Sequence, residues 1–479
     1  MKNSTQVRVR FAPAPTGMMH LGNVRAAVIN YLFARQKKGV FIVRIEDTDV
    51  ERNYDPGALN IIADLQWLKL LHDEGPGVGG AYGPYFQSER MNIYQKFLDI
   101  LCQKELCYRC FCSVELLEKK RMRMQAAGLA PRYDRACLQL SSHEVQQKLS
   151  EQTPFIWRFK LDHSQKVTVN DLAHGIKTFE LHNFSDFPLT RSDGSFTFIF
   201  ANFVDDMEMK ITHIFRGEDH LTNSACQAPL FDAFNVARPL YLHMPILCNI
   251  DGKKLSKRDF GFSLRDLKDA GFLPEAIVNY LAIIGGSFAQ EIMSVDQLIQ
   301  AFAFDHIHTT GHIKYNVEKL RWINRRWLHA MEPALFISLA KPFLIKAYPS
   351  ATAGDQQKVD MLLKAVQNDI QTLCDIVPML AFYFDFKPAL PADVDTFLNE
   401  GERNQLKEAL VAALPNIATQ EVFMNALKTA LNKIIEPKRW LSVMRLMLTG
   451  TAQGIAVGQL IEMLGSDAQL RLKEGLRLL

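Results

Sequence analysis

The sequence has no long apolar run, no strong excess of charge of one sign and no low-complexity tract. None of its apolar stretches reaches the roughly 18 residues that a membrane-spanning helix needs, so we expect no transmembrane segment. Its 55 Lys and Arg residues nearly balance 52 Asp and Glu residues, and the net charge of +3 excludes a simple polycation. Any binding to nucleic acid must therefore depend on local patches of charge.

Cysteine is sparse, with eight residues in 479, and the N-terminal residues lack the apolar core of a signal peptide. We therefore expect a cytoplasmic protein with reduced thiols. At about 100–200 residues per domain, the length predicts three or four domains. The hydrophobic share of 48% is ordinary for a globular chain and argues against intrinsic disorder.

The first fifty residues predict a strand, a helix and a second strand. Residues 6–11 alternate, residues 22–38 carry apolar side chains at helical spacing with Gly39 as the stop, and residues 40–45 form a nearly continuous apolar run. Ligands of such a βαβ unit bind beyond the carboxyl ends of the strands. The free N–H groups at the start of the helix would face the same crevice and favour a phosphate.

A second α/β stretch follows a region of different composition. Residues 197–204 and 211–215 predict strands, residues 223–235 a helix, and residues 240–247 another strand. From about residue 274 onward the pattern is almost entirely helical. We therefore predict one nucleotide-binding α/β sheet that is interrupted by an inserted α+β domain and followed by an all-α C-terminal region.

The turn after the first strand could hold a phosphate. In the segment Pro13–Asn23, His20 and Asn23 stand three residues apart and could both donate to one phosphate. Gly22 would let a base or ribose approach the backbone. The alternative is a turn rich in proline and glycine with a surface histidine.

A basic loop follows the last predicted strand of the second stretch. Residues 251–258 carry four cations in six residues beside a glycine turn, which excludes a packed core. Lys254 and Lys257 could close over the β- and γ-phosphates of a nucleotide, with Ser256 donating a hydrogen bond. The alternative is a solvated basic loop. The two motifs are informative together, because one would open the nucleotide site and the other would close it.

These motifs resemble those of the class I aminoacyl-tRNA synthetases, and in particular of the bacterial glutamyl-tRNA synthetases. His20–Asn23 resembles the family's HIGH element, and Lys254–Arg258 resembles its KMSKS loop. The likeness covers almost the whole chain through six further strings, which are residues 10–17, 41–49, 83–90, 202–206, 215–220 and 271–276. In this order and spacing the strings are specific to the family.

The resemblance implies attachment of glutamate to tRNA through a glutamyl-adenylate, with ATP and Mg²⁺ as cofactors and activation that requires bound tRNA. It implies His20 and Lys257 as catalytic residues. The ATP-binding residues would be Gly22, Asn23, Lys254, Ser256 and Lys257. The alternatives are a small nucleotidyltransferase of the same superfamily, which would not need the helical region, and a non-catalytic or altered-specificity tRNA-binding paralogue.

For glutamate, the resemblance implies a binding site whose residues are Arg10, Ala12, Glu46, Asn202 and Arg216. The chemistry agrees, because a dicarboxylic amino acid needs two cationic groups and one anionic group for its ammonium. Two departures concern hydroxyl groups: Ala14 stands where the family usually has serine, and Phe198 where it usually has tyrosine. Each lost hydrogen bond would weaken recognition by about 0.5–1.5 kcal/mol.

Five of the eight cysteines lie between Cys102 and Cys137. In a segment that resembles the family's zinc-bearing insertion, Cys110, Cys112 and Cys137 could share a tetrahedral Zn²⁺ with Tyr133 or a water as fourth ligand. The alternative is a metal-free knuckle, because Gln139 stands where some relatives place a histidine. Four other cysteines are expected to be ordinary buried residues: Cys102, Cys107, Cys226 and Cys248.

The resemblance divides the chain into five parts. They are a Rossmann-like catalytic domain in two halves (residues 1–90 and 191–255), an inserted acceptor-stem-binding domain (91–190), the KMSKS loop with a stem-contact helical domain (256–325), and a helical anticodon-binding domain (326–479). We expect tRNA(Glu) as the partner, no membrane association, and a monomer.

Two features of the C-terminal region concern tRNA. Residues 320–328 interleave aromatic and cationic side chains, which indicates either an RNA-facing surface or a junction helix whose tryptophans pack inward. From residue 324 onward 17 Lys and Arg residues stand against 16 Asp and Glu residues, so the region is not basic overall. In an expected helix over 364–373, relatives that charge only their own tRNA tend to carry an arginine, whereas this chain has Gln367–Asp369. We therefore expect altered anticodon discrimination that permits tRNA(Gln).

Overall fold

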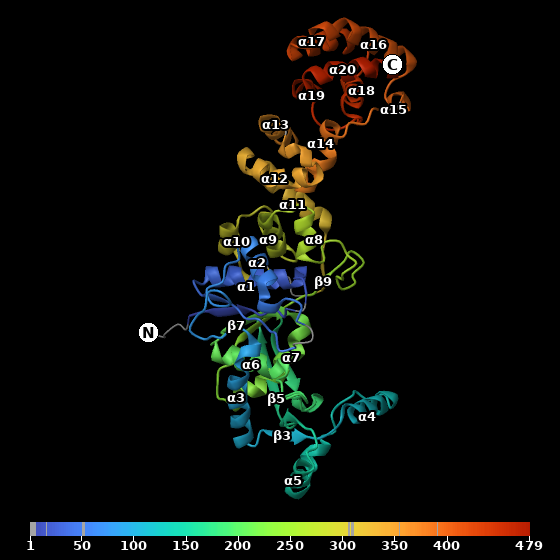
Figure 1. Ribbon diagram of the computed structural model, residues 1–479. Helices are drawn as coiled ribbons and strands as arrows, with labels where there is room; N and C mark the ends of the chain where they lie inside the picture. Colours follow the sequence, from blue (N-terminus) through green and yellow to red (C-terminus); the bar gives the residue numbers. More distant parts are fainter. Residues whose placement is uncertain are drawn as a thin grey trace. The chain divides into compact units, whose positions relative to one another are not determined.

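The computed structural model describes residues 6–15, 17–49, 53–304, 307, 311–353, 355–389 and 391–479 (Figure 1). The chain forms two compact units. The first comprises Met1–Asp266 and Ile277–Val317, and the second comprises Leu267–Ala276 and Glu318–Leu479. In the described ranges, every helix is too short or too polar to cross a membrane.

The first unit is built on a six-stranded sheet in the order β2-β1-β7-β8-β5-β6. The strands are β2 (Val40–Val43), β1 (Arg8–Phe11), β7 (His213–Gly217), β8 (Leu240–Met244), β5 (Lys166–Asp171) and β6 (Gly175–Glu180). All neighbours pair in parallel except β5 and β6, which form an antiparallel hairpin. The predicted α/β sheet is confirmed, and the carboxyl ends of its five parallel strands lie at one edge.

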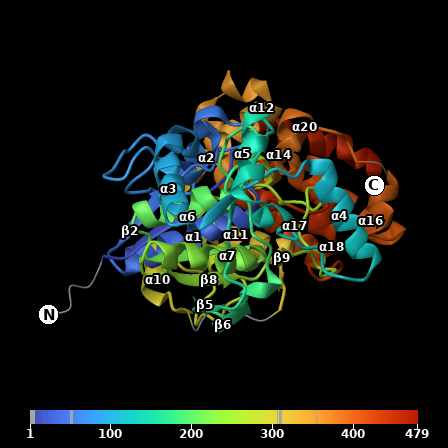
Figure 2. The same cartoon turned by 90° about the horizontal axis from the view of Figure 1, so that it is seen from below.

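Helices cover this sheet and position its loops. The first, α1 (Leu21–Gln36), packs against β1, β2 and β7, and α7 (Leu221–Ala233) packs against β5 and α6 (Phe198–Glu208) (Figure 2). The βαβ prediction for the first fifty residues is therefore confirmed. Gly39 does not end α1 through a left-handed backbone, because Lys38 takes the positive φ of 51°. Gly39 instead permits close approach, since a Cβ there would lie 2.4 Å from the carbonyl oxygen of Val7.

The predicted strand over residues 197–204 is wrong, because this segment begins α6 with Thr197 as its N-cap. Its apolar run belongs to a helix that is buried on most sides, with Phe200, Phe203 and Val204 in the core. A short apolar run of this kind does not distinguish a buried strand from a buried helix. The predictions for 211–215, 223–235 and 240–247 correspond to β7, α7 and β8.

The segment between the two predicted halves of the sheet contributes to the sheet itself, because β5 and β6 lie within residues 91–190. The remaining helices and strands of the first unit and its boundary are α2 (Leu59–Trp67), α3 (Met91–Gln103), β3 (Cys107–Cys110), α4 (Val114–Ala126), α5 (Ser142–Ser150), β4 (Ile156–Phe159), β9 (Leu247–Cys248), α8 (Leu264–Asp269), α9 (Pro274–Ile283), α10 (Val295–Ala301) and β10 (Ile313–Lys314). The inserted segment thus combines helices, its own β3–β4 pair and two strands of the main sheet.

The second unit is helical, as predicted for the C-terminal region. Its helices are α11 (Val317–Ala330), α12 (Pro333–Ala347), α13 (Gln356–Val366), α14 (Ile376–Phe384), α15 (Pro391–Asp395), α16 (Glu400–Ala413), α17 (Gln420–Leu431), α18 (Pro437–Thr449), α19 (Val457–Leu464) and α20 (Ser466–Gly475). Its core includes the fully buried Trp440 on α18. The predicted helix over 364–373 is wrong, because α13 ends at Val366. Two bonds from the side chain of Gln367, to the carbonyl oxygens of Leu328 and Met331, hold the chain where it leaves the helix.

Candidate active site

A pocket of about 540 Å³ lies beyond the carboxyl ends of the parallel strands. Its lining includes residues at or just after the ends of β1, β2, β7 and β8, which are Arg10, Glu46, Arg216 and Met244. This is where a parallel α/β sheet places its ligands. All the residues that line the pocket belong to the first unit.

His20 is the N-cap of α1 and has an extended backbone. Its Nδ1 accepts a hydrogen bond from the backbone N–H of Asn23 at 3.2 Å, so the proton of the neutral ring is on Nε2. Burial, together with the charge of Lys254, lowers the pKa of His20 and keeps the ring neutral near pH 7. His20 can therefore donate one hydrogen bond into the pocket that it lines.

Gly22 serves a purpose that the sequence did not indicate. A Cβ at this position would lie 3.0 Å from Cε1 and Nδ1 of His20, which is tighter than ordinary carbon contacts. Glycine therefore makes room for the imidazole of His20. Gly22 and Asn23 also line the pocket, as predicted for ATP-binding residues.

The segment just after the basic loop, residues 262–264, contacts the His20 turn. The N–H of Leu21 donates to the carbonyl oxygen of Phe262 at 2.9 Å, and the N–H of Leu264 donates to Met19 at 2.9 Å. The rings of His20 and Phe262 lie 5.6 Å apart. Two segments that are more than 200 residues apart in sequence therefore lie side by side, as the two-motif hypothesis required.

The three residues of the basic loop that were predicted to bind ATP do not all line the pocket. Lys254 lines the pocket, and its Nζ lies 3.5 Å from the Asp219 carboxylate. In the described part of the chain, the lining includes neither Ser256 nor Lys257. Ser256 donates its hydroxyl to Asp259 at 2.8 Å, and Lys257 is exposed. Of the two lysines predicted to bind ATP, Lys254 is therefore the one that lines the pocket in this structure.

The five predicted glutamate-binding residues all line the pocket. Arg10 is buried and pairs with Asp206, whose Oδ1 lies 3.1 Å from Nε. Asp206 also accepts a hydrogen bond from Arg44 at 2.7 Å. Arg10 therefore has a fixed orientation and a direct counter-charge inside the protein.

Glu46 is the acidic residue among the five predicted glutamate-binding residues. It accepts hydrogen bonds from Arg44 at 3.2 Å and from the side-chain amide of Asn202. Burial raises the pKa of Glu46, while the nearby Arg44 and Arg10 oppose the shift. An ammonium group bound here would favour the ionised carboxylate in the same way.

Arg216 differs from Arg10 because, within the described residues, no carboxylate forms an ion pair with it. Its Nη2 donates to Ser224 Oγ at 2.5 Å and to Gln227 Oε1 at 3.1 Å. Its Nε and Nη1 are buried without a hydrogen-bond partner among the described residues. Burial, followed by the charge of Arg10, lowers the pKa of Arg216 to about 10. Buried donors of this kind fit a negatively charged ligand, because leaving them unpaired is costly.

The sequence analysis did not single out Ser224, Gln227 or Asp219 as functional residues. No motif marks Ser224 and Gln227, whereas Asp219 falls in the family-like string 215–220. The two departures from the family pattern do fall in the site, since Ala14 and Phe198 both line the pocket. The ring of Phe198 lies 5.6 Å from the ring of His220. The absent hydroxyls therefore concern the pocket directly.

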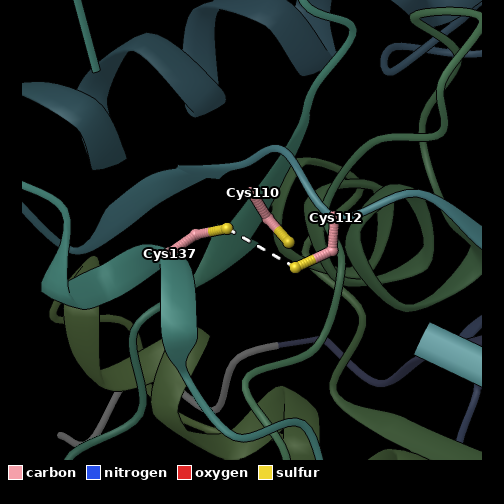
Figure 3. Close-up of side chains that lie close together, drawn as sticks. All are labelled: Cys110, Cys112 and Cys137. Atoms are coloured by element: carbon pink, nitrogen blue, oxygen red, sulfur yellow. Dashed lines mark hydrogen bonds between the residues drawn. The ribbon is translucent and has the colours of Figure 1, made fainter. Parts of the chain in front are cut away.

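The four predicted zinc ligands come together in the inserted segment, and Figure 3 shows the three cysteines among them. The sulfur atoms of Cys110, Cys112 and Cys137 all lie within 4.8 Å of one another, and Cys112 and Cys137 are 3.6 Å apart. The Tyr133 hydroxyl lies 3.3 Å from Cys110 Sγ and 3.9 Å from Cys112 Sγ. Three thiols and one phenol around a common point fit a small tetrahedral ion.

Of the four cysteines expected to be ordinary buried residues, only Cys248 is buried. Cys226 is half-buried, and so are Cys102 and Cys107. The sulfur atoms of Cys102 and Cys107 lie 3.0 Å apart. The expectation of separate, buried thiols is therefore wrong for this pair, which stands at the junction of α3 and β3.

In the second unit, the helix α11 fits neither prediction completely. Trp322 and Trp327 are half-buried, so they do not pack fully inward. The Nζ of Lys319 lies 4.1 Å from the Trp322 ring centroid.

Beyond α13, Asp369 is exposed and lines a pocket of about 710 Å³, together with Lys387 and residues around Gly450.

Comparison with known proteins agrees with this geometry. Residues 6–322 match the family described as "tRNA synthetases class I (E and Q), catalytic domain", and residues 335–476 match "Anticodon binding domain". The fold and the pocket are therefore those of a class I aminoacyl-tRNA synthetase.

Relatives that match nearly the whole chain identify a particular family within this class. The chain is 36% identical over 477 residues to a glutamate–tRNA ligase of Carboxydothermus hydrogenoformans, covering 97% of this chain and 99% of the relative. It is 35% identical to glutamate–tRNA ligase 2 of Syntrophus aciditrophicus, covering 99% of each. A crystal structure of a glutamate tRNA ligase from Elizabethkingia meningosepticum, in complex with its amino acid, superposes with a TM-score of 0.86 at 30% identity over 99% of both chains. The chain belongs to the glutamate–tRNA ligase family.

Proposed function

We propose that this protein attaches glutamate to tRNA in an ATP-dependent reaction with a glutamyl-adenylate intermediate. The observation that carries the proposal is the composition of one pocket, which joins a phosphate-binding end to an amino-acid-binding end. His20 and Lys254 belong to the first end, and Arg10, Glu46 and Arg216 belong to the second.

In the first step, an oxygen of the glutamate α-carboxylate attacks the α-phosphorus of ATP, and the bond to pyrophosphate breaks. His20 donates from Nε2 to a phosphate oxygen as charge develops, and Lys254 neutralises the phosphate chain. Mg²⁺ accompanies the nucleotide and supplies further positive charge to the phosphates. The protein contributes positioning and charge stabilisation, and no covalent enzyme intermediate is needed.

The amino-acid end selects glutamate by its three charges. Glu46 holds the ammonium group with help from Asn202, which is already bonded to it. Arg216 takes the side-chain carboxylate, because its Nε and Nη1 have buried, unpaired donors whereas Arg10 is paired with Asp206. The α-carboxylate is then left beside the phosphates, where it must react.

In the second step, the terminal ribose hydroxyl of tRNA attacks the adenylate carbonyl and releases AMP. The test is ATP–pyrophosphate exchange, with and without tRNA, using glutamate, glutamine and aspartate. We expect exchange with glutamate alone and only when tRNA is present. No tRNA-dependent exchange with any amino acid would overturn the proposal and leave a non-catalytic tRNA-binding protein.

The inserted segment holds Zn²⁺ through Cys110, Cys112, Cys137 and Tyr133. Support comes from the convergence of the four side chains and from Arg158, whose guanidinium carbon lies 4.1 Å from the Tyr133 ring centroid and offsets negative charge. Such an ion would tie β3 to the turn that contains Cys137 and stabilise the fold.

The tRNA partner is tRNA(Glu), and the second unit also accepts tRNA(Gln). Support comes from the exposed Asn368 and Asp369, which replace the arginine that the resemblance leads us to expect in this stretch. An exposed carboxylate neither donates hydrogen bonds to a base nor attracts a phosphate. The discrimination that such an arginine provides would therefore be absent.

A further inference from the structure

A chain of hydrogen bonds links Arg216 to three fully buried polar residues. They are Asp171 at the end of β5, His243 on β8 and Ser224 on α7, each at most 1% exposed. Nδ1 of His243 lies 2.5 Å from Asp171 Oδ2, and Nε2 lies 2.8 Å from Ser224 Oγ. Ser224 Oγ in turn accepts from Arg216 Nη2 at 2.5 Å. We call these three residues the relay.

The direction of each hydrogen bond in the relay is determined by Asp171. Its carboxylate also accepts from the backbone N–H groups of Ala173, His174 and His243 at 2.8, 2.9 and 3.2 Å, so it is held as an ionised acceptor. The Nδ1 of His243 must then carry the proton. Burial lowers the pKa of His243, although the bond to Asp171 opposes the shift, so the ring stays neutral and Nε2 accepts the Ser224 proton. The lone pairs of Ser224 are left for Arg216.

The relay orients Arg216 through intervening side chains, whereas Asp206 orients Arg10 by a direct ion pair. Arg10 touches its carboxylate at 3.1 Å, whereas Arg216 is linked to Asp171 only through His243 and Ser224. Tyr241 supports the arrangement, because its ring stacks on His243 at 5.5 Å between centroids and lies 5.7 Å from the Arg216 guanidinium carbon. Arg216 is thereby held in one orientation without a counter-ion that would compete with a ligand carboxylate.

We propose that Asp171, His243 and Ser224 are positioning residues that orient Arg216 and so determine selection of glutamate over glutamine. The inference rests on the proposed function. With Nη2 occupied by Ser224 and Gln227, the remaining Nε and Nη1 offer only N–H donors. A carboxylate accepts from such donors, whereas the NH₂ group of glutamine would add a further buried donor without an acceptor. Removing Ser224 as one of the two acceptors of Nη2 lets the guanidinium reorient and weakens this distinction.

The test compares Ser224→Ala with Ser224→Thr, which keeps the hydroxyl, and with Thr222→Ala, a matched loss at an exposed position on the same helix. We expect Ser224→Ala to raise the KM for glutamate about tenfold, with kcat and the KM for ATP within twofold. Ser224→Thr should recover most of the loss, and Thr222→Ala should match the wild type. Exchange with glutamine should stay below detection in the wild type, Ser224→Thr and Thr222→Ala, and should become measurable in Ser224→Ala, so that the ratio of kcat/KM for glutamate to that for glutamine falls in this variant alone.

Two results would overturn the inference. One is an equal rise in the KM for glutamate and the KM for ATP in Ser224→Ala. The other is an unchanged ratio of kcat/KM for glutamate to kcat/KM for glutamine. A second measurement is independent of catalysis, namely the rise in Tm of each protein on addition of glutamate, which we expect to shrink in Ser224→Ala and in Asp171→Asn. If the wild type catalyses no glutamate-dependent exchange, the proposed function fails. If the wild type is active and the Ser224→Ala variant is unaltered in both measurements, only the relay fails.

Discussion

The backbone N–H of Asn23 donates to the imidazole Nδ1 of His20 across 3.2 Å. This bond occupies one ring nitrogen with an N-cap interaction and leaves the Nε2–H to act on a ligand. The histidine of the first motif therefore caps its own helix and provides a hydrogen-bond donor at the same time. A neutral ring is sufficient for both tasks.

Replacing His20 by alanine should lower the rate of glutamate-dependent ATP–pyrophosphate exchange about 100-fold, because a donor to the developing phosphate charge is lost. The KM for ATP should change little. Met18→Ala, at an exposed position two residues earlier, is the control. Steady-state kinetics of the three proteins check the prediction, and equal losses in both variants would contradict it.

The pH dependence of the same reaction follows from the environment of His20. Burial and Lys254 lower its pKa below the ordinary 6.5, so the ring remains neutral as the pH falls through that value. The acid limb of the exchange rate that depends on His20 should therefore have its inflection below pH 6.5 and should be missing in His20→Ala. An inflection at or above pH 6.5 would mean that the pKa of His20 is not lowered, and a rate that rises as the pH falls through the pKa would mean that the imidazolium is required.

Lys254 and Lys257 should both be needed for activation, although only Lys254 lines the pocket here. We expect Lys254→Ala and Lys257→Ala each to lower the exchange rate by about 100-fold, since each removes a positive charge from the phosphates. Affinity for tRNA, measured by filter binding, should fall far less. Lys253→Ala, which is exposed and adjacent, serves as the control. A normal rate in Lys257→Ala would remove that residue from the catalytic assignment.

Arg216→Ala should raise the KM for glutamate by about 10- to 100-fold through loss of charge-assisted hydrogen bonds. The KM for ATP should stay within twofold, because the nucleotide end of the pocket is separate. Arg238→Ala, which removes an arginine paired with Asp232 near the surface, controls for the loss of a cation from the same unit. Parallel increases in both KM values would argue against a role in binding glutamate.

Purified protein should contain one Zn²⁺ per chain, measured by elemental analysis, and a chelator should lower its Tm. Cys112→Ser should lose the metal, whereas Cys226→Ser should keep it, because Cys226 lies outside the cluster. Only a trace of zinc in the wild type would rule out the metal site and leave a knuckle held by hydrogen bonds.

Asp369→Arg should reduce charging of tRNA(Gln) relative to tRNA(Glu), because it restores a cation beside the pocket that contains Lys387 and Gly450. Initial rates of glutamylation of the two tRNAs, measured at one salt concentration, give the ratio. Glu436→Arg makes the same change of charge elsewhere in the second unit and should leave the ratio unaltered. Failure of the wild type to charge tRNA(Gln) would contradict the proposal that the second unit accepts both tRNAs.

Much of the first unit could be predicted from the sequence because its signals are local. The alternation before Phe11, the helical spacing after Gly22 and the apolar run after Gly39 each specify one element. The sequence also predicted that His20 and the Lys254 loop lie near each other, because each motif directly follows a strand of the sheet. The motif residues Arg10, Glu46 and Arg216 fall in the pocket for the same reason.

The predictions that were wrong share a physical cause. In each of these segments the structure is determined by tertiary contacts, which the local sequence does not show. Residues 198–204 are apolar apart from Asn202, and burial against α3 and α7 decides that they form a helix. The α13 helix ends where Gln367 finds two carbonyl groups on another segment. Asp171, Ser224 and His243 come from three elements and form no pattern in sequence, so the relay becomes visible only in three dimensions.

The pairing of β5 with β8 means that the inserted segment is not a removable accessory. The strand that it lends to the central sheet ends at Asp171, so excising residues 91–190 would remove both β5 and β6 from the sheet together with the carboxylate that orients His243.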